Sequence, residues 1–157
     1  MLPDLKEHAL LLGKILGNLQ TLEFSLRVSL HRKEPKPSRD LLALKVGDVV
    51  DANYLTDYSS LIDLIEDYNN KIANNNPIFS INCGIVDLRD ALAHGRILAP
   101  ESGFLQIVKF SKKDKNSKVE VVFAEQITPG WLKSQIKKVH DEILKIINFN
   151  KNIFKAN

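Results

Sequence analysis

The sequence lacks several features that would each indicate a particular class of protein. Its 157 residues include one cysteine, which excludes a framework of internal disulfides and is typical of a reducing compartment. No apolar run is long enough to span a membrane, and no basic region precedes an apolar one near the N-terminus. We therefore expect a cytoplasmic protein with neither a secretory signal nor a membrane partner.

Signatures of bound groups are also lacking. The chain has no glycine-rich phosphate loop, and its four histidines and one cysteine do not fall at the spacing of zinc ligands. We therefore expect no cofactor and no metal. We interpret His8, His31 and His140 as surface or half-buried helix residues, and Cys83 as a small core residue.

The overall composition of the chain is ordinary for a globular protein. Hydrophobic residues make up 44% and charged residues 26%, which is enough for one domain, residues 1–157, with a sizeable core. The formal net charge of +3 permits contact with RNA. It is too small to argue for RNA by itself, because a dedicated nucleic-acid binder usually carries a denser basic patch.

Hydrophobic periodicity predicts a mainly α fold. Apolar residues recur at helical spacing over 4–32, 56–73 and 79–94 and after Pro129. The stripe of the first predicted helix contains Leu5, Ala9, Leu12, Ile15, Leu16, Leu19, Leu22, Leu26 and Leu30. Thr56 and Thr128 are the expected N-caps of the second and last helices. From Phe149 onward we expect a fraying tail.

Strands are predicted between the third and fourth helices. Arg96 to Leu98 is a candidate short strand, and the β-branched and aromatic runs 104–110 and 118–123 predict a hairpin with a basic turn. The insertion covers about residues 96–124. The expected architecture is an up-and-down bundle of about four helices, with this small hairpin inserted before the last helix.

Polar side chains gather at the end of the third predicted helix. Arg89, Asp90 and His94 interrupt an otherwise apolar helix, and its expected apolar stripe is Ile85, Leu88 and Leu92. Gly95 is expected to close the helix in the left-handed conformation. His94 would then lie in the last turn, where the helix dipole favours the imidazolium form.

These polar residues also have purely structural interpretations. Arg89 could pair with a carboxylate, and a core-facing Glu23 is one candidate. Glu23 could instead form a surface i, i+4 pair with Arg27. Asp90 could be a solvated surface residue, and His94 could bond the last carbonyls of its helix.

The run Arg-Asp-Ala-Leu-Ala-His at residues 89–94 resembles the signature of the HEPN superfamily of helical domains. That signature is an arginine, then asparagine, aspartate or histidine, then three residues and a histidine. The Gly95 that follows is also similar to many members. The resemblance implies a helical bundle whose active members cut RNA without a metal, and in which two motifs face each other in a homodimer.

The resemblance also implies roles for particular residues. Cleavage through the ribose 2′-hydroxyl needs proton transfer and a cation that stabilises the charged phosphorane. His94 would be the acid or base, Arg89 the phosphate clamp and Asp90 a supporting polar residue. Arg96 could extend the positive surface toward the substrate, or could be a plain exposed arginine on a strand.

Two classes of function therefore stand. The first is a metal-independent endoribonuclease acting as a toxin or defence effector, with RNA, a second copy of the chain and an antitoxin or other protein as partners. The alternative is a non-catalytic helical module that dimerises or binds a partner, with RNA binding without cleavage as a weaker third. The nuclease predicts that Arg89 and His94 converge at an open positive cleft or across a two-fold axis. The module predicts that they are buried or held in local pairs.

Overall fold

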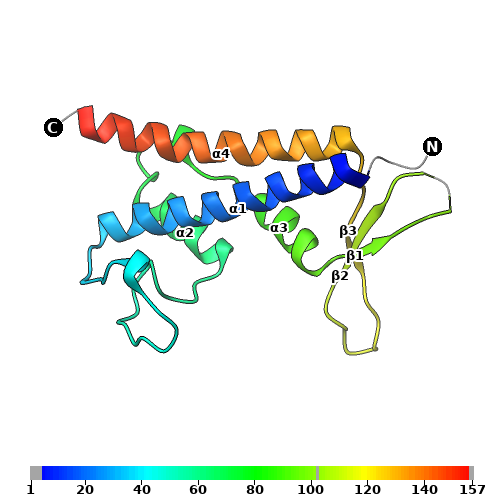
Figure 1. Ribbon diagram of the computed structural model, residues 1–157, viewed down its shortest axis with the longest axis horizontal. Coiled ribbons are helices and arrows are strands. Elements are labelled where there is room, and N and C mark those ends of the chain that lie inside the picture. Colours follow the sequence, from blue (N-terminus) through cyan, green and yellow to red (C-terminus); the bar gives the residue numbers. More distant parts are fainter. Residues whose placement is uncertain (1–4, 102, 156–157) are drawn as a thin grey trace. The chain divides into compact units, whose positions relative to one another are not determined.

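A computed structural model describes residues 5–101 and 103–155 (Figure 1). The helices are α1 (Leu5–Lys33), α2 (Leu61–Lys71), α3 (Ile85–His94) and α4 (Pro129–Lys155), and the strands are β1 (Arg96–Leu98), β2 (Gln106–Phe110) and β3 (Val121–Gln126). Single 3₁₀ turns cover Leu41–Ala43 and Pro77–Phe79. The expected mainly α class, with strands inserted before the last helix, is confirmed. Within the described residues, no helix combines the length and the apolar character needed to cross a bilayer.

The start of α2 differs from the prediction because of a local capping box. The Asp63 backbone N–H donates to Ser60 Oγ at 3.3 Å, and the Ser60 N–H donates to Asp63 Oδ2 at 3.1 Å. Two free amide groups of the first turn are satisfied in this way, so the helix begins at Leu61. Thr56 is not the cap, because its Oγ1 accepts from the Asn53 N–H at 3.0 Å in the preceding loop.

The start of α3 also lies later than the predicted residue 79. The Asn69 side chain accepts from the Ile81 N–H at 2.8 Å and donates to the Ile81 carbonyl at 2.9 Å. Both backbone groups of Ile81 are thereby used outside a helix, and α3 begins at Ile85. Its buried stripe is Ile85, Leu88 and Ala91, so Ala91 takes the place expected for Leu92.

The last helix begins as predicted and ends later than predicted. Thr128 caps it, because Thr128 Oγ1 accepts from the Trp131 N–H at 3.0 Å. The fraying expected from Phe149 is wrong, since α4 continues to Lys155. The Phe149 ring makes edge contacts with Phe79 and Tyr68, with ring centroids 5.4 Å and 6.4 Å apart, and these contacts anchor the last turns.

The chain divides into two compact units. The first, called here the sheet unit, consists of Gly84–Asp141 with the described part of Met1–Leu19. The second, the loop unit, consists of Gln20–Cys83 with the described part of Glu142–Asn157. The sheet unit therefore contains α3 and all three strands. The loop unit contains α2 and the long segment between α1 and α2.

The sheet unit is built around an antiparallel sheet of order β1-β2-β3. Ile107 of β2 pairs with Ile97 of β1 and is fully buried. An irregularity between Lys109 and Phe110 shifts the register with β3. The core of this unit contains Leu11, Ile15, Ile85, Leu88, Ala91, Ile107, Ile127, Leu132 and Val139.

The stripe of α1 is rotated at its N-terminal end relative to the prediction. His8 and Leu11 are buried there, while Leu5 and Leu16 are exposed. His8 Nε2 lies 2.8 Å from the carbonyl oxygen of Ile127, just after β3, so the buried ring has a hydrogen-bond partner. The interpretation of His8 as a surface or half-buried residue is therefore wrong.

The loop unit is held by an arginine of α1. Arg27 donates to Glu23 at 3.1 Å and to Asp57 Oδ1 at 2.9 Å. It also donates to the carbonyl oxygens of Tyr54 at 2.9 Å and Ser59 at 2.8 Å. Glu23 thus forms the i, i+4 pair with Arg27. The first segment of this unit ends at Cys83, which is exposed, so the expectation that Cys83 is a core residue is wrong.

Candidate functional site

The end of α3 lies tightly against the sheet, and Gly95 makes this possible. Gly95 has φ −70° and ψ 157°, so the expected left-handed conformation is wrong. A Cβ atom there would collide with the Ala91 carbonyl oxygen and lie 2.8 Å from Ile107 Cγ1. Glycine is therefore required for close approach and not for a positive φ. The chain passes directly from His94 through Gly95 into β1.

Asp90 lies between two cationic side chains. Arg89 Nη1 donates to Asp90 Oδ1 at 2.9 Å, and Lys109 Nζ donates to Asp90 Oδ2 at 3.3 Å. Partial burial opposes ionisation of this carboxyl, but the two cationic donors outweigh burial and lower the pKa of Asp90 below its ordinary value. Asp90 is thus an anion that connects α3 to β2.

Lys109 is a site residue that the sequence interpretation missed. It lies two residues after the buried Ile107, so strand alternation places both side chains on the face of the sheet that meets α3. Its side chain is 22% exposed. A lysine on the inward face of a strand is a signal that it pairs with a carboxylate, but the partner cannot be read from the strand pattern.

Arg89 is only partly occupied by Asp90. Its side chain is 41% exposed, and Asp90 is the one partner found for it within residues 5–101 and 103–155. A guanidinium group carries five N–H donors in a planar fork. Most of those donors therefore remain available to a ligand in solution.

His94 is exposed in the last turn of α3. It makes no hydrogen bond to the described part of the chain, so the capping interpretation has no supporting contact. Asp90 and His94 are separated by four residues and share one face of the helix. Arg89 is about 140° around the helix from His94, at 100° per residue, so the two side chains leave α3 on different faces.

Arg96 lies on the other face of the sheet from Lys109. It pairs with Val108 across the strands, and its guanidinium carbon lies 5.1 Å from the centroid of the Phe110 ring. The side chain is exposed. The structure therefore brings Arg89, Asp90 and Lys109 into direct contact, leaves His94 open on the same helix, and places Arg96 against an aromatic ring just beyond the helix end.

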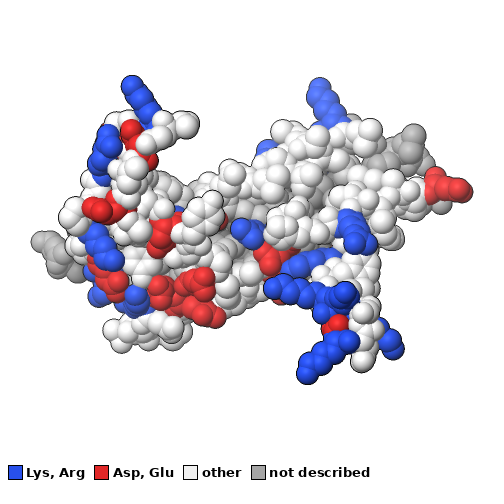
Figure 2. All heavy atoms as spheres, turned by 90° about the horizontal axis from the view of Figure 1, so that it is seen from below, with Lys and Arg blue, Asp and Glu red and all other residues white. Residues whose placement is uncertain are grey.

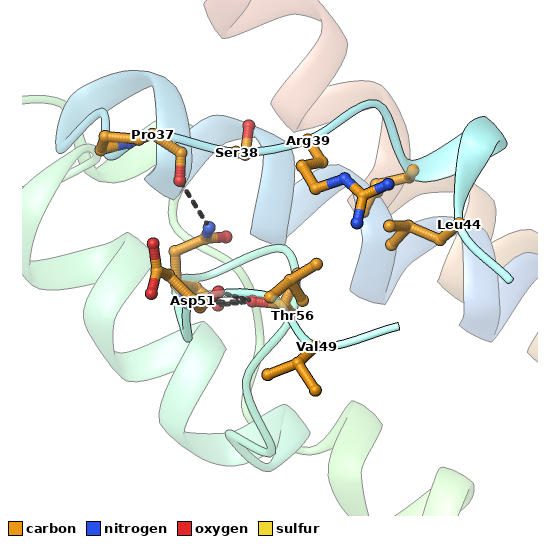
Figure 3. Close-up of a pocket in the computed structure, with 10 residues that line it drawn as sticks. Pro37, Ser38, Arg39, Leu44, Val49, Asp51 and Thr56 are labelled. Carbon is orange, nitrogen blue, oxygen red and sulfur yellow. Dashed lines mark hydrogen bonds between the residues drawn. The ribbon is translucent and has the colours of Figure 1, made fainter. Parts of the chain in front are cut away.

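Two cavities lie elsewhere, both in the loop unit. One of about 320 Å³ is enclosed by the segment 37–56, and Figure 3 shows Arg39 and Asp51 beside it. Another of about 530 Å³ lies among residues such as Arg32, Asn75 and Phe149. Neither is lined by Arg89, Asp90 or His94. Of the motif residues, His94 is exposed, and Arg89 and Asp90 are partly exposed.

Comparison with known proteins assigns no relative to this chain. No family model, no curated protein and no solved structure matches it. Among the described residues, no group of three or more His, Cys, Asp or Glu side chains is arranged to hold a metal ion. The functional proposal therefore rests on the side chains around Asp90.

Proposed function

We propose that this protein is a metal-independent endoribonuclease of the HEPN type. One observation carries the proposal: Asp90 binds Arg89 on one oxygen and Lys109 on the other, while His94 stands open one turn further along α3. A partly free arginine, a lysine and an exposed histidine are the side chains needed to bind a phosphate and move a proton beside it.

The chemistry uses the ribose of the substrate as the nucleophile. A base removes the proton of the 2′-hydroxyl, the 2′-oxygen bonds to phosphorus, and the bond from phosphorus to the 5′-oxygen breaks. An acid returns a proton to that 5′-oxygen, which leaves a 2′,3′-cyclic phosphate and a 5′-hydroxyl. Histidine is the side chain suited to either proton transfer near neutral pH, so His94 is the proposed acid or base.

Arg89 is the proposed phosphate clamp. Its planar fork donates two parallel N–H groups to the non-bridging oxygens, where negative charge accumulates in the transition state. Asp90 acts as a positioning residue, because it fixes the guanidinium through one N–H and leaves the others free. Asp90 is charged at neutral pH, and its lowered pKa extends the charged form to more acidic solutions.

A second copy of the chain completes the proposed site. One motif supplies one histidine, whereas the reaction needs both a base and an acid. A homodimer with α3 at its interface would bring a second His94 to the scissile phosphate. Mixing the parent with an excess of His94→Ala protein tests this arrangement. A mixed dimer keeps one His94, so activity should fall well below the parent's share of the mixture if the site needs both histidines, and should follow that share if each copy works alone.

The main test is cleavage of single-stranded RNA in EDTA. The parent should cleave, and Arg89→Ala and His94→Ala should each lose about 10²–10³-fold in rate, the usual effect of removing one transition-state contact. Arg39→Ala and His140→Ala are matched controls: Arg39 is an exposed arginine paired with Asp48, and His140 is an exposed helical histidine. Equal cleavage by all five proteins would identify a contaminating nuclease and remove the proposal.

One observation favours the non-catalytic alternative. The contact from Arg89 to its neighbour Asp90 is the kind of local pair that a structural role predicts. A dimer that neither cleaves a panel of RNAs nor changes its oligomeric state on Arg89→Ala would support a partner-binding module. The antitoxin or other protein partner would then be the ligand to seek.

A further inference from the structure

The register of the sheet places the end of α3 level with the end of β2, at the base of the β2–β3 hairpin loop. Arg96 pairs with Val108, whereas Leu98 pairs with Gln106, so β1 begins near the end of β2 that leads into the hairpin loop. His94 and Gly95 directly precede Arg96. The histidine of the motif and the hairpin loop therefore lie at the same end of the strands (Figure 1).

The loop of this hairpin, residues 111–120 and called here the lysine loop, carries four lysines against two carboxylates, Asp114 and Glu120, and is therefore net positive. Its four lysines are exposed and make no ion pair within the described chain; they are Lys112, Lys113, Lys115 and Lys118. The Asp114 carboxylate accepts the backbone N–H groups of Asn116 and Lys118, both at 2.8 Å. Asp114 thus builds the turn. In Figure 2, blue side chains project from this end of the molecule.

The lysine loop is shaped by further backbone contacts. The Ser111 N–H donates to the Glu120 carbonyl at 2.8 Å, and the Glu120 N–H donates to Ser111 Oγ at 2.9 Å. Ser117 takes φ 61°, the left-handed conformation that closes the turn. These bonds hold the loop in a defined shape, which reduces the entropy lost when it binds a ligand.

A flat platform adjoins the lysines. The Arg96 guanidinium lies over the Phe110 ring at 5.1 Å, and Phe110 is the last residue of β2 before the loop. Phe110 is half-buried and Arg96 is exposed, so the guanidinium above the ring remains accessible from solvent. Stacked arginine and aromatic groups are the surfaces on which unpaired bases pack.

We propose that the lysine loop and the Arg96–Phe110 platform bind single-stranded RNA and lead it to His94. This inference deepens the proposed function and rests on it. A base next to the scissile phosphate stacks on Arg96, and the lysines contact the phosphates that follow. A duplex is disfavoured because its paired and stacked bases cannot reach the platform. The combination of a net positive loop with a stacking surface favours RNA over an acidic protein, which would need only the charge.

The test measures binding separately from cleavage. The ligand is a 2′-O-methyl oligonucleotide, which lacks the free 2′-hydroxyl and cannot be cut, and the readout is fluorescence anisotropy over a salt series. Lys112, Lys113, Lys115 and Lys118 are changed together to Gln. We expect affinity to fall at least tenfold and the salt slope to drop by about 2–3, from roughly 0.7 per phosphate contact on a single strand.

A matched variant controls for net charge. Lys14, Lys36, Lys45 and Lys151 are exposed and make no described ion pair, and changing them to Gln removes the same charge elsewhere. Equal loss in both quadruple variants would overturn the inference, because it would then be a general charge effect. Phe110→Leu should weaken binding about tenfold if a base stacks there. Circular dichroism melting establishes that each variant is folded.

The remaining outcomes separate this inference from the proposed function. The inference would be overturned if duplex RNA or polyglutamate bound as tightly as single-stranded RNA. Equally tight binding of polyglutamate would indicate an acidic protein partner. Cleavage by the parent with unchanged binding by the lysine-loop variant would overturn the inference and leave the nuclease standing. Binding that depends on the lysine loop, with no cleavage of any RNA, would remove the nuclease and support RNA capture alone.

Discussion

Arg27 and Arg89 are both helix arginines next to carboxylates, yet their surroundings differ. Arg27, in the loop unit, is 12% exposed and donates to two carboxylates and to backbone carbonyls of the segment 54–59. Arg89, in the sheet unit, is 41% exposed and has one described partner, Asp90. The first guanidinium is satisfied by the protein, and the second keeps most of its donors for a ligand.

The difference separates a structural arginine from a candidate functional one. A buried guanidinium has lost its water and needs protein acceptors for its N–H groups, so Arg27 fixes the loop that supplies them. Arg89 remains hydrated on its free side and can exchange that water for phosphate oxygens. The motif alone does not make this distinction, because both arginines stand near an acidic residue in the sequence.

The largest expected effect is on stability when Arg27 is removed. Arg27→Met leaves Glu23, Asp57 and backbone carbonyls of the segment 54–59 without their donor, and we expect a loss of about 2–3 kcal/mol in the free energy of unfolding. Arg89→Met should cost less than about 1 kcal/mol, as for an exposed ion pair. Urea denaturation measures both. Similar losses from the two variants would show that Arg89 is as structural as Arg27.

Gly95 offers the next largest effect. Gly95→Ala introduces a Cβ atom that meets Ala91 and Ile107, so we expect a loss of about 1–3 kcal/mol from overpacking. Gly13 of α1 has open space around its Cβ position, and Gly13→Ala should gain about 0.5–1 kcal/mol from helix propensity. Thermal melts of the two variants should therefore shift in opposite directions. A neutral Gly95→Ala would argue against tight contact between the helix end and β2.

Two tyrosines of the loop unit differ in whether their hydroxyl groups form hydrogen bonds. The Tyr54 hydroxyl donates to Asp67 and accepts from Lys71, both at 2.7 Å, whereas the fully buried Tyr68 hydroxyl has no partner among the described residues. Burial raises the pKa of Tyr68 to about 12. Tyr68→Phe should leave stability unchanged or raise it by up to about 1 kcal/mol, while Tyr54→Phe should lower it by a similar amount. Denaturant midpoints of the two variants decide this.

The smallest expected effect compares the carboxylates that serve the two arginines. Burial opposes ionisation of Asp57, but bonds from Ser59 and Arg27 outweigh it and lower its pKa, and Arg89 and Lys109 do the same for Asp90. A carboxyl group whose pKa is lower in the folded than in the unfolded state stabilises the protein at pH values above its unfolded pKa of ~3.9. That contribution is lost as the pH falls through ~3.9 toward the folded pKa.

Substitution by asparagine isolates each contribution to acid sensitivity. Asp57→Asn and Asp90→Asn should each flatten the decline of stability below pH ~4, by about 1 kcal/mol or less for such partly exposed pairs. Stability measured from pH 6 downward tests this, with Asp141→Asn as a surface control. An unchanged acid slope in both variants would place the sensitivity in other carboxylates.

Much of the fold follows from local patterns. The long helices α1 and α4 were predictable, because their periodicity extends over many residues and Thr128 supplies a recognisable cap. β-branched and aromatic composition predicted the strands, but β3 covers Val121–Gln126 and not 118–123. The boundaries of α2 and α3 were not, because competing side-chain bonds from Ser60 and Asn69 decide them. The burial of His8 was not predictable from the sequence either, because its hydrogen-bond partner is the backbone carbonyl of Ile127, far along the chain.

The sequence by itself determined the mainly helical class, the strands before the last helix, and the clustering of Arg89, Asp90 and His94 on one short helix. These depend on neighbours within a few positions. The tertiary structure decided that Lys109 pairs with Asp90 and that Gly95 allows close packing. It also decided that the lysine loop extends from the end of the sheet at which α3 ends. Each depends on strand register and on contacts between residues far apart in the chain, which no local pattern encodes.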